Sequence, residues 1–473
     1  MPSELENLQA QIKRYCDALD KRASEAKTLD DYREGIFPLP PFVQDTGLTD
    51  AYRTLMRLSG ANWPGLIVGA VEERLEVQGV RFGGKQADED VWDLWQEAGL
   101  DAESSMLHDS VLTTGRGFAQ VWGDGSADPQ PVVTLEHASM CIVEYVPGTN
   151  GTLRKGALRR WTDGKKWYAN LFTPRYLFKF VADSEACPTD AASWKVREDD
   201  GDEEWPLENP LGVVPIVEFA VNKSLRPSPF GTGRGEFASH LRHIDRIHYK
   251  LFSGLVALTW SGFPLRYVIG DPIVYAKKDD GTEDKSKPIP PFDSIASAVA
   301  QFSNANVKVG QLPEANVDNY SPEMDIKHLA ALTKTPANYL LGELVNVSAD
   351  GIRAAEAGLV SKVRRHHRPL GESWEEVTRL ALRVKNPEDP RGKDQSAQII
   401  WKAPEMRSLA EQADAAAKLG AAGLPWQGIA EIVLGLTPQE IKRYGAERGS
   451  DVLGKLLNDG APAAASANAV SAG

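Results

Sequence analysis

Apolar residues recur along this chain with two different periods, and the change of period divides the chain into sections. In residues 1–30 they lie three and four positions apart, which predicts one amphipathic helix. These positions are Leu5, Leu8, Ile12, Cys16 and Leu19. In residues 116–220, short alternating runs such as GFAQVWG and PVVTLEH are separated by Gly, Pro and Asp. That alternation predicts a β-rich section.

Between these sections the pattern is mostly helical. A helix is expected to open near Pro64 and to pass into a short strand that ends at Gly83 and Gly84. The segment VWDLWQEAGLDAESSMLHDSVLTTG then predicts two helical turns and a longer helix that ends at Gly115. The N-terminal half therefore combines helices with a block of strands.

The longest apolar stripe lies in residues 236–260, where spacings of three and four continue without a break. It consists of Phe237, Leu241, Ile244, Ile247, Leu251, Leu255 and Leu258. Arg242, Arg246 and Lys250 are four residues apart and fall on the opposite side of the predicted helix. At 1.5 Å per residue the helix is roughly 40 Å long. One small domain cannot cover that length, so we expect the helix to pack beside copies of itself.

The periodicity stops after Gly262. Residues 263–320 contain a short predicted strand, PLRYVIG, and a polar insert, AKKDDGTEDKSKPIPP. Ser321 and Pro322 suit the first positions of another helix, which we expect to run to about Thr335. A long helix is predicted from about Asp350 with a kink at Pro369. The chain is helical with short loops from Trp401, and after Asp459 it ends in a low-complexity tail.

Composition narrows the class of protein. The chain has 473 residues, of which 42% are hydrophobic and 25% charged. This length predicts more than one core, because single hydrophobic cores stop growing at roughly 250–300 residues. No run reaches the ~18 apolar residues of a membrane span, and the charged N-terminus lacks the apolar region of a secretion signal. We therefore expect a chain that stays in the cytoplasm of the cell that makes it.

Charge and cysteine content each exclude a class of function. The net charge of −13 argues against tight, sequence-independent DNA binding, because that affinity comes from Lys and Arg at phosphates. It does not argue against a channel through which DNA slides. Cys16, Cys141 and Cys187 lie far apart with no CxxC spacing. We therefore predict reduced, structural thiols, and neither a disulfide framework nor a zinc site.

Several local patterns resemble anion sites, and two of them lack an essential part. Residues 79–85 have the glycines and lysine of a phosphate-binding loop, but Gln86 stands where Ser or Thr would reach magnesium. Residues 231–235 are glycine-rich, but Glu236 replaces the final glycine of the motif. Its carboxylate would repel an anion at the place where one would bind, so a simple helix start is favoured. The basic cluster at residues 364–368 fits a solvated helix face and a phosphate or subunit contact equally well.

Candidate metal ligands are few. His240 and His243 have the i, i+3 spacing that could share a metal, but no third ligand accompanies them. No nucleophile elbow or catalytic triad pattern is present, so we predict no catalytic, cofactor-binding or metal-binding residue and no cofactor. An enzyme acting on nucleic acid through metal held by Asp90, Asp93 and Glu97 remains the alternative.

Five passages, in order along the chain, resemble the portal proteins of tailed bacteriophages with long, non-contractile tails. They are NWPGLIVGAVEERLEVQGVRF, SVLTTGRGFAQVWGD, NPLGVVPIVEFAVNKSLRPSPFGTGRGE, YSPEMDIKHLAALTKTPANYLLGE and WKAPEMRSLAEQADAAAKLGAAGLP. They are similar, in turn, to the family's wing helix and strand, its helix-Gly-strand step, the approach to the stem, the second stem helix with the tunnel loop, and the start of the crown. The resemblance covers nearly the whole chain.

This resemblance implies an α+β portal fold that is mainly helical, with a β-rich wing, long stem helices, a small α/β clip and a helical crown. The expected parts are the wing at 1–235, stem helix 1 at 236–262, the clip at 263–320, stem helix 2 at 321–340, the tunnel loop at 341–349, a long kinked wing helix at 350–386, the crown at 387–459 and a disordered tail at 460–473. Twelve identical subunits would usually surround a central channel.

The resemblance also implies the sites. The tunnel loop would bring Leu344, Val345, Asn346, Val347 and Ser348 to the DNA. Arg242, Arg246 and Lys250 would face the channel or form salt bridges between subunits. Lys277, Lys278, Lys285 and Lys287 would form a docking surface on the clip, although a solvated loop explains each of them equally well.

The implied function is a conduit for double-stranded DNA during packaging and ejection, at one vertex of the virion capsid, after assembly in the host cytoplasm. The implied partners are the terminase large subunit, a head-tail adaptor, and the major capsid and scaffold proteins, with no membrane. Besides the enzyme, a minor head or scaffold protein is the remaining alternative, and it would lack a regular ring.

Overall fold

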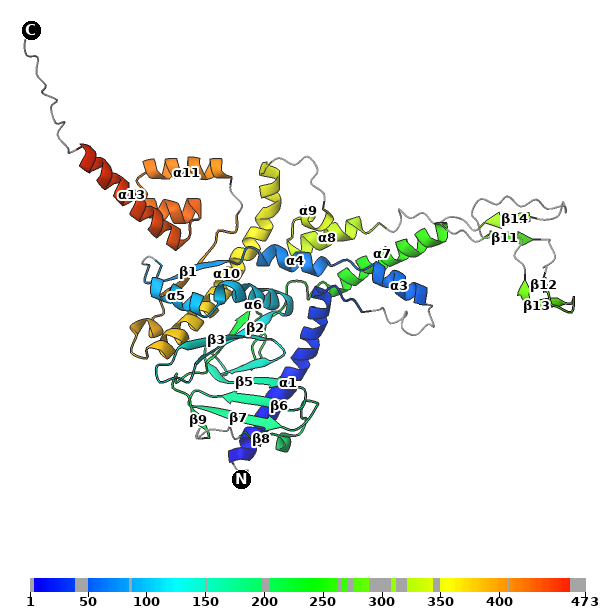
Figure 1. Ribbon diagram of the computed structural model, residues 1–473, viewed down its shortest axis with the longest axis horizontal. Coiled ribbons are helices and arrows are strands. Elements are labelled where there is room, and N and C mark those ends of the chain that lie inside the picture. Colours follow the sequence, from blue (N-terminus) through cyan, green and yellow to red (C-terminus); the bar gives the residue numbers. More distant parts are fainter. Residues whose placement is uncertain are drawn as a thin grey trace, which may run out of the picture. The chain divides into compact units, whose positions relative to one another are not determined.

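A computed structural model of the chain describes residues 4–38, 50–84, 87–149, 151–197, 205–262, 266–269, 275–288, 308–311, 321–342, 349–405 and 408–459. The chain forms two compact units (Figure 1). Unit 1 comprises Met1–Glu34, Trp63–Ser239 and Ala330–Gly473, and unit 2 comprises Gly35–Asn62 and His240–Leu329. The predicted tunnel-loop residues 344–348 and the tail 460–473 lie outside the described residues.

In unit 1 an N-terminal helix, α1 (Glu4–Arg33), lies against a six-stranded antiparallel sheet (Figure 1). The strand order is β4-β5-β6-β7-β8, and β9 also pairs with β7. The bounds are β4 Cys141–Tyr145, β5 Arg154–Thr162, β6 Trp167–Phe172, β7 Tyr176–Ala182, β8 Lys195–Val196 and β9 Leu207–Glu208, with a 3-10 turn at Ala191–Ser193. One core cluster joins Ile12, Cys16 and Leu19 of α1 to the sheet. The helix predicted for residues 1–30 is confirmed.

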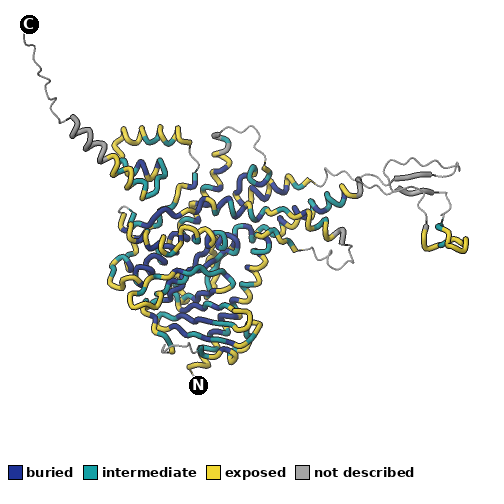
Figure 2. The backbone as a smooth tube through the Cα atoms, viewed as in Figure 1, coloured by how far each residue is buried: buried dark blue, intermediate teal, exposed yellow. Residues whose placement is uncertain are grey.

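A second, three-stranded sheet has the order β10-β2-β3. Its strands are β2 Arg116–Gly123, β3 Pro131–His137 and β10 Ile216–Ala220. A cluster that includes Phe118 and Ile216 of this sheet and Val143 and Phe172 of the six-stranded sheet packs the two together. The β-rich section predicted between residues 116 and 220 is therefore confirmed, and Figure 2 shows that most of its strands are buried.

The helices before these sheets follow the predicted order. They are α4 (Trp63–Glu72), α5 (Glu89–Glu97) and α6 (Leu100–Thr114), and α6 ends at Gly115 with a φ of 89°. Strand β1 (Val77–Phe82) follows α4 as expected. It pairs with β15 (Ala397–Trp401), a contact between segments far apart in the sequence that the hydrophobic pattern did not predict. The predicted crown range thus contains a strand that completes a sheet with β1.

The long helix α10 (Ala349–Lys385) runs through unit 1 and contains Pro369 in its interior. Its predicted apolar face is buried, with Leu359, Val363, Leu370 and Trp374 fully inaccessible. The indole of Trp374 donates to His108 Nε2 at 2.9 Å. Burial lowers the pKa of His108 to about 4, so this histidine is neutral and acts as an acceptor inside the core.

The C-terminal part of unit 1 is helical, as predicted. Its elements are a 3-10 turn at Pro390–Lys393, α11 (Leu409–Ala421), α12 (Trp426–Ile429), a π-helical turn at Ala430–Leu434 and α13 (Pro438–Asp459). Ser408 and Glu411 form a reciprocal capping box at the start of α11. Figure 2 shows that α11 is largely exposed.

The described part of unit 2 consists of helices and two small antiparallel sheets of two strands each. Its elements are α3 (Asp50–Leu58), α7 (Leu241–Gly262), the first turns of α8 (Glu323–Thr333), and the strands β11 (Arg266–Ile269), β12 (Tyr275–Lys277), β13 (Glu283–Pro288) and β14 (Lys308–Gln311). Strand β11 pairs with β14, and β12 pairs with β13. Within the described part of the chain, no helix is long and apolar enough to cross a membrane.

One predicted helix start is wrong. The helix expected from residue 236 begins at Leu241, so buried Phe237 belongs to the preceding segment. The helix expected from Ser321 to about Thr335 is confirmed as α8, and the range 321–340 expected for stem helix 2 also contains a separate short helix, α9 (Ala337–Leu341). Lys334 adopts a left-handed φ of 53° and Pro336 cannot continue a helical hydrogen-bond ladder, which explains the break.

Candidate functional site: α7, α8 and the segment leading into α7

The glycine-rich segment 231–235 passes against the corner between α6 and β2. A Cβ on Gly235 would lie 1.9 Å from the carbonyl oxygen of Thr113, and a Cβ on Gly233 would lie 2.3 Å from that of Gly115. These glycines therefore permit a close backbone approach. The segment is not a helix start: Glu236 N donates to Leu112 O at 2.8 Å, outside any helical ladder.

Glu236 ends this segment inside a buried ionic cluster of unit 1. Its carboxylate lies 3.1 Å from Lys362 Nζ and 2.9 Å from His366 Nε2, and all three side chains are nearly inaccessible. Asn222 donates to Glu236 at 2.8 Å. Burial alone would raise the pKa of Glu236, but the hydrogen bond from His366 and the charge of Lys362 lower it to about 2. Lys362 also donates to Thr333 O at 2.7 Å, which ties the end of α8 to α10.

The basic cluster at residues 364–368 is thereby divided. His366 is buried against Glu236, and His367 stacks on Trp401 at 4.7 Å between ring centroids. Arg364 pairs with Glu405, and Arg365 donates to Asn222 at 3.2 Å. Both histidine rings therefore pack against side chains of the same chain, while the arginines remain exposed.

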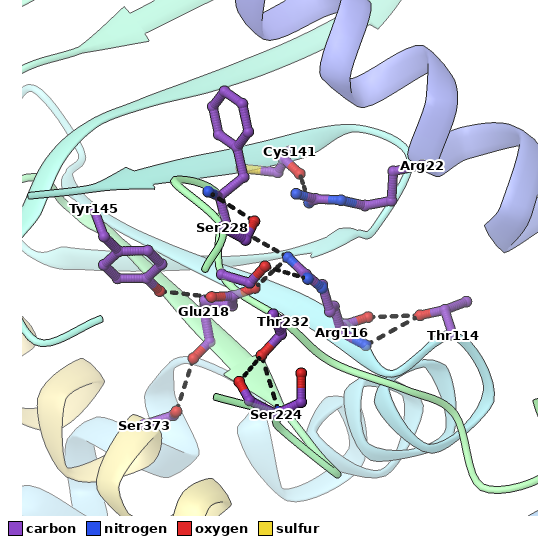
Figure 3. A network of polar contacts seen from close by, with 12 residues as sticks. Arg22, Thr114, Arg116, Cys141, Tyr145, Glu218, Ser224, Ser228, Thr232 and Ser373 are labelled. Atoms are coloured by element: carbon purple, nitrogen blue, oxygen red, sulfur yellow. Dashed lines mark hydrogen bonds and ion pairs between the residues drawn. The ribbon is translucent and has the colours of Figure 1, made fainter. Parts of the chain in front are cut away.

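The loop before segment 231–235 is held at its base by a second buried carboxylate, Glu218 of β10 (Figure 3). Arg116 Nη1 lies 3.1 Å from Glu218, and Tyr145 Oη donates to it at 2.6 Å. The same guanidinium donates to the carbonyls of Phe230 at 2.6 Å and Gly231 at 2.8 Å. Burial and the nearby Glu218 raise the pKa of Tyr145, so it remains a donor. This network fixes the path of the chain toward α7 with buried, charge-assisted hydrogen bonds.

The basic residues on α7 meet a single carboxylate. Arg246 Nη2 lies 2.8 Å and Lys250 Nζ 2.6 Å from Asp325 of α8, and His243 Nε2 lies 2.8 Å from the Asp325 carbonyl oxygen. The hydrogen bond from Lys250, and then the charge of Arg246, hold the pKa of Asp325 below its usual value. These salt bridges lie within one subunit, an arrangement that the sequence did not predict. Arg242 is exposed.

The apolar side of α7 is only partly covered within unit 2. Ile244 and Ile247 are fully buried, and His248 Nε2 lies 2.9 Å from the Ala61 carbonyl oxygen. Burial lowers the pKa of His248. Leu258, the last residue of the apolar stripe, is 56% exposed, and Tyr249, on the opposite side of the helix, is 46% exposed. The C-terminal end of the stripe is therefore exposed.

The four lysines predicted to form a docking surface lie on or beside the β12–β13 hairpin, and all are exposed. They are Lys277, Lys278, Lys285 and Lys287. Lys277 stands opposite Glu283 in the ladder, and Lys278 N donates to Thr282 O at 2.8 Å across the turn. Lysines and carboxylates are mixed on one hairpin, which gives a surface suited to exchangeable polar contacts.

The helices on either side of residues 343–348 share one anchor in unit 1. Arg74, at the end of α4, donates to Tyr339 Oη of α9 at 2.9 Å and lies 3.5 Å from Glu356 of α10. Tyr339 also donates to Glu356 at 2.9 Å. No spacing in the sequence signals this triad, because each residue comes from a different element.

The candidate ligand residues for the alternative enzyme are not brought together. Asp90 lies 3.4 Å from Arg391, which also pairs with Asp88 at 2.9 Å. In the part of the chain that the structure describes, no group of three or more His, Cys, Asp or Glu residues is placed to hold a metal ion. His243 is engaged with the backbone of Asp325 instead.

Comparison with known proteins gives one consistent family. The model of the family described as phage portal protein, SPP1 Gp6-like, matches residues 12–452. The portal protein of Mycobacterium phage L5 is 28% identical over 87% of this chain and 83% of its own length. The portal protein of Mycobacterium phage D29 is 26% identical over 79% of this chain and 75% of its own length.

Among solved structures, a chain from the neck of a native GTA particle, computed with C12 symmetry, matches 81% of this chain and 92% of its own length at 14% identity, with a TM-score of 0.42. The family match spans almost all of the described chain, including the segment leading into α7, both helices that Asp325 joins, and the Arg74 anchor. This chain belongs to the phage portal protein family.

Proposed function

We propose that twelve copies of this chain form a ring at one vertex of a phage capsid, through which double-stranded DNA is packaged and later ejected. The observation that carries the proposal is the family match over residues 12–452. In this proposal the subunit catalyses no reaction, and the energy for translocation comes from the separate terminase large subunit. The ring assembles in the host cytoplasm and remains in the virion.

The contacts between subunits involve the exposed end of the apolar stripe on α7. Leu258 is a large apolar side chain that the rest of the chain leaves exposed, and a neighbouring copy would bury it. A closed ring arises from heterologous contacts, in which two different faces of each copy meet. Arg242, exposed on the side of α7 opposite the stripe, would contact a second neighbour or the channel.

The channel contact is assigned to residues 344–348, which are uncharged. Leu344, Val345, Asn346, Val347 and Ser348 could touch a moving duplex without holding its phosphates, since phosphate contacts come chiefly from charged and hydrogen-bonding groups. Arg246 and Lys250 share the single negative charge of Asp325, so together they would present one net positive charge to DNA instead of two. A weakly binding wall is what a conduit requires.

The exposed hairpin β12–β13 is the proposed docking surface for partners. Its four lysines are mixed with carboxylates, which suits successive contacts with the terminase large subunit and a head-tail adaptor. The major capsid and scaffold proteins would contact other parts of the ring. The hairpin supplies specificity through charge arrangement, because isolated exposed ion pairs each contribute less than about 1 kcal/mol.

Negative-stain electron microscopy with mass photometry of the purified full chain tests the ring. Closed rings with a central hole and a mass near twelve subunits are expected. A compact particle without a hole, together with magnesium-dependent nuclease or ATPase activity of the pure chain, would overturn the proposal. The variant Leu258→Asp should reduce ring formation, whereas Leu225→Asp, at a side chain that is 98% exposed on a loop, serves as a matched surface control.

A further inference from the structure

Two cysteines meet where α1 lies against the six-stranded sheet. Cys16 is 1% exposed in a core cluster, and the half-exposed Cys187, in the loop after β7, packs against that cluster. The interaction between the two thiol groups is the largest influence on the pKa of each. Both residues are free cysteines, and two thiols from distant parts of the sequence meet at the same core cluster.

A buried arginine lies close to both thiols and donates a hydrogen bond to Cys187. Arg160 Nη1 donates to Cys187 Sγ at 3.1 Å, while Nη2 donates to Asp20 of α1 at 2.5 Å. Arg160 is only 4% exposed, and its guanidinium also lies over the ring of Trp167 at 5.5 Å. A fixed positive charge beside a sulfur favours the thiolate form, which is the nucleophile in disulfide chemistry.

The shifts in pKa agree with this geometry. The contact with Cys16, and then the charge of Arg160, lower the pKa of Cys187. The contact with Cys187, and then burial, raise the pKa of Cys16 far above its usual range. Cys187 is thus the partly exposed thiol with the lowered pKa, and Cys16 is the thiol protected inside the core.

We propose that Cys16 and Cys187 are a redox pair that closes into a disulfide when the protein meets a small-molecule disulfide such as oxidised glutathione. In the first step the Cys187 thiolate attacks the reagent, forms a mixed disulfide and releases one glutathione thiolate. In the second step Cys16 gives up its proton and its sulfur attacks Cys187 Sγ, which releases the second glutathione thiolate. Two protein thiols are oxidised, one reagent disulfide is reduced, and the two protons pass to the released thiolates.

The disulfide would fasten α1 to the sheet covalently. Without it, α1 depends on its core contacts and on polar contacts such as Arg14 and Tyr15 with Glu144, the latter at 2.5 Å. Because a reducing compartment keeps thiols reduced and an extracellular medium permits disulfides, the pair would stay open in a cell and close in a released particle. A cross-link between positions far apart in the sequence stabilises chiefly by restricting the unfolded chain.

Oxidised glutathione with the purified full chain tests the proposal. After exposure, remaining thiols are blocked with N-ethylmaleimide and the peptides are mapped by mass spectrometry. We expect a cross-linked peptide pair containing Cys16 and Cys187, with Cys141 alkylated only after unfolding, since Cys141 is fully buried in a different cluster. The melting temperature should rise by a few degrees and return to its starting value when dithiothreitol is added.

Variants make the outcome decisive. Cys187→Ser should abolish both the cross-link and the reversible rise in melting temperature, whereas Cys141→Ala should retain both. Since Cys16 lies in the core and its replacement could impair folding, the half-exposed Cys187 is the informative position. A stable glutathione adduct on Cys187 that never converts into the internal cross-link, or an absence of reaction at either thiol, would overturn the proposal.

Discussion

Lys362 Nζ lies 3.1 Å from the carboxylate of Glu236, and less than 5% of either side chain is exposed. The pair joins α10 to the segment that leads into α7. Breaking a buried pair by removing one partner leaves an uncompensated buried charge, which is strongly destabilising. The folded state therefore requires both charged residues at this site, even if the net free energy of their attraction is small.

The variant Lys362→Met should be destabilised by about 3 kcal/mol, at the low end of the range for buried pairs, because His366 still contacts Glu236. The double variant Glu236→Gln/Lys362→Met should lose clearly less than the sum of the two single variants. Denaturant unfolding followed by tryptophan fluorescence measures this coupling. Strict additivity would show that the two charges do not act as a pair.

Glu236 also makes a definite contribution to acid sensitivity. Its pKa is lowered from the usual 4.5 to about 2, so its stabilising effect is complete above about pH 4.5 and is lost as the pH falls toward 2. The full effect is on the order of 3 kcal/mol. The melting temperature of the wild-type chain should fall across this window more steeply than that of Glu236→Gln. Parallel pH profiles for the two proteins would contradict the assignment.

Much of the secondary structure could be predicted from periodicity alone. The buried faces of α1 and α10 and the strands between residues 116 and 220 follow directly from apolar spacing, because each buries one side against a core. The start of α7 was wrongly placed at residue 236, since Phe237 continues the apolar spacing although the helix begins only at Leu241. Periodicity reports burial, and it does not report which backbone groups pair.

The polar contacts could not be predicted in the same way. Spacing placed Arg246 and Lys250 on one face of a helix, but their partner Asp325 comes from another helix beyond the predicted clip. Arg74, Tyr339 and Glu356 likewise come from separate elements. The residues predicted for the tunnel loop and the clip lysines remain predictions, because a single subunit carries no information about the channel or its partners.

Removing the shared carboxylate on α8 should loosen α8 without unfolding the chain. In Asp325→Asn, both Arg246 and Lys250 lose their charged partner, and since both cations are more than a third exposed the loss should be only about 1 kcal/mol. Hydrogen exchange of the α8 amides should become several-fold faster. Arg242→Gln, at an exposed position on α7, should leave that exchange unchanged. Equal acceleration in both variants would show that the ion pairs of Asp325 do not specifically hold α8.

The hydrogen bonds among Arg74, Tyr339 and Glu356 should hold together the two helices on either side of residues 343–348. The variant Tyr339→Phe removes the hydroxyl that bridges Arg74 and Glu356, at a cost of about 1 kcal/mol for lost hydrogen bonds. Limited proteolysis between α9 and α10 should then become faster. The variant Tyr249→Phe, at an exposed tyrosine on α7, provides the control. Unchanged cleavage in Tyr339→Phe would mean that the triad does not restrain this part of the chain.

The glycine-rich segment 231–235 gives the sharpest steric prediction. A Cβ at position 235 would lie 1.9 Å from the Thr113 carbonyl oxygen, a backbone atom that cannot move without displacing the end of α6. Gly235→Ala should therefore lower the melting temperature by many degrees or yield insoluble protein, because the clash is with the main chain of Leu112 and Thr113. The control is Gly69→Ala in α4, where an added Cβ meets nothing within 4 Å and helix propensity favours alanine. Normal folding of Gly235→Ala would show that the chain can approach α7 by another path, and would remove the steric explanation for this run of glycines.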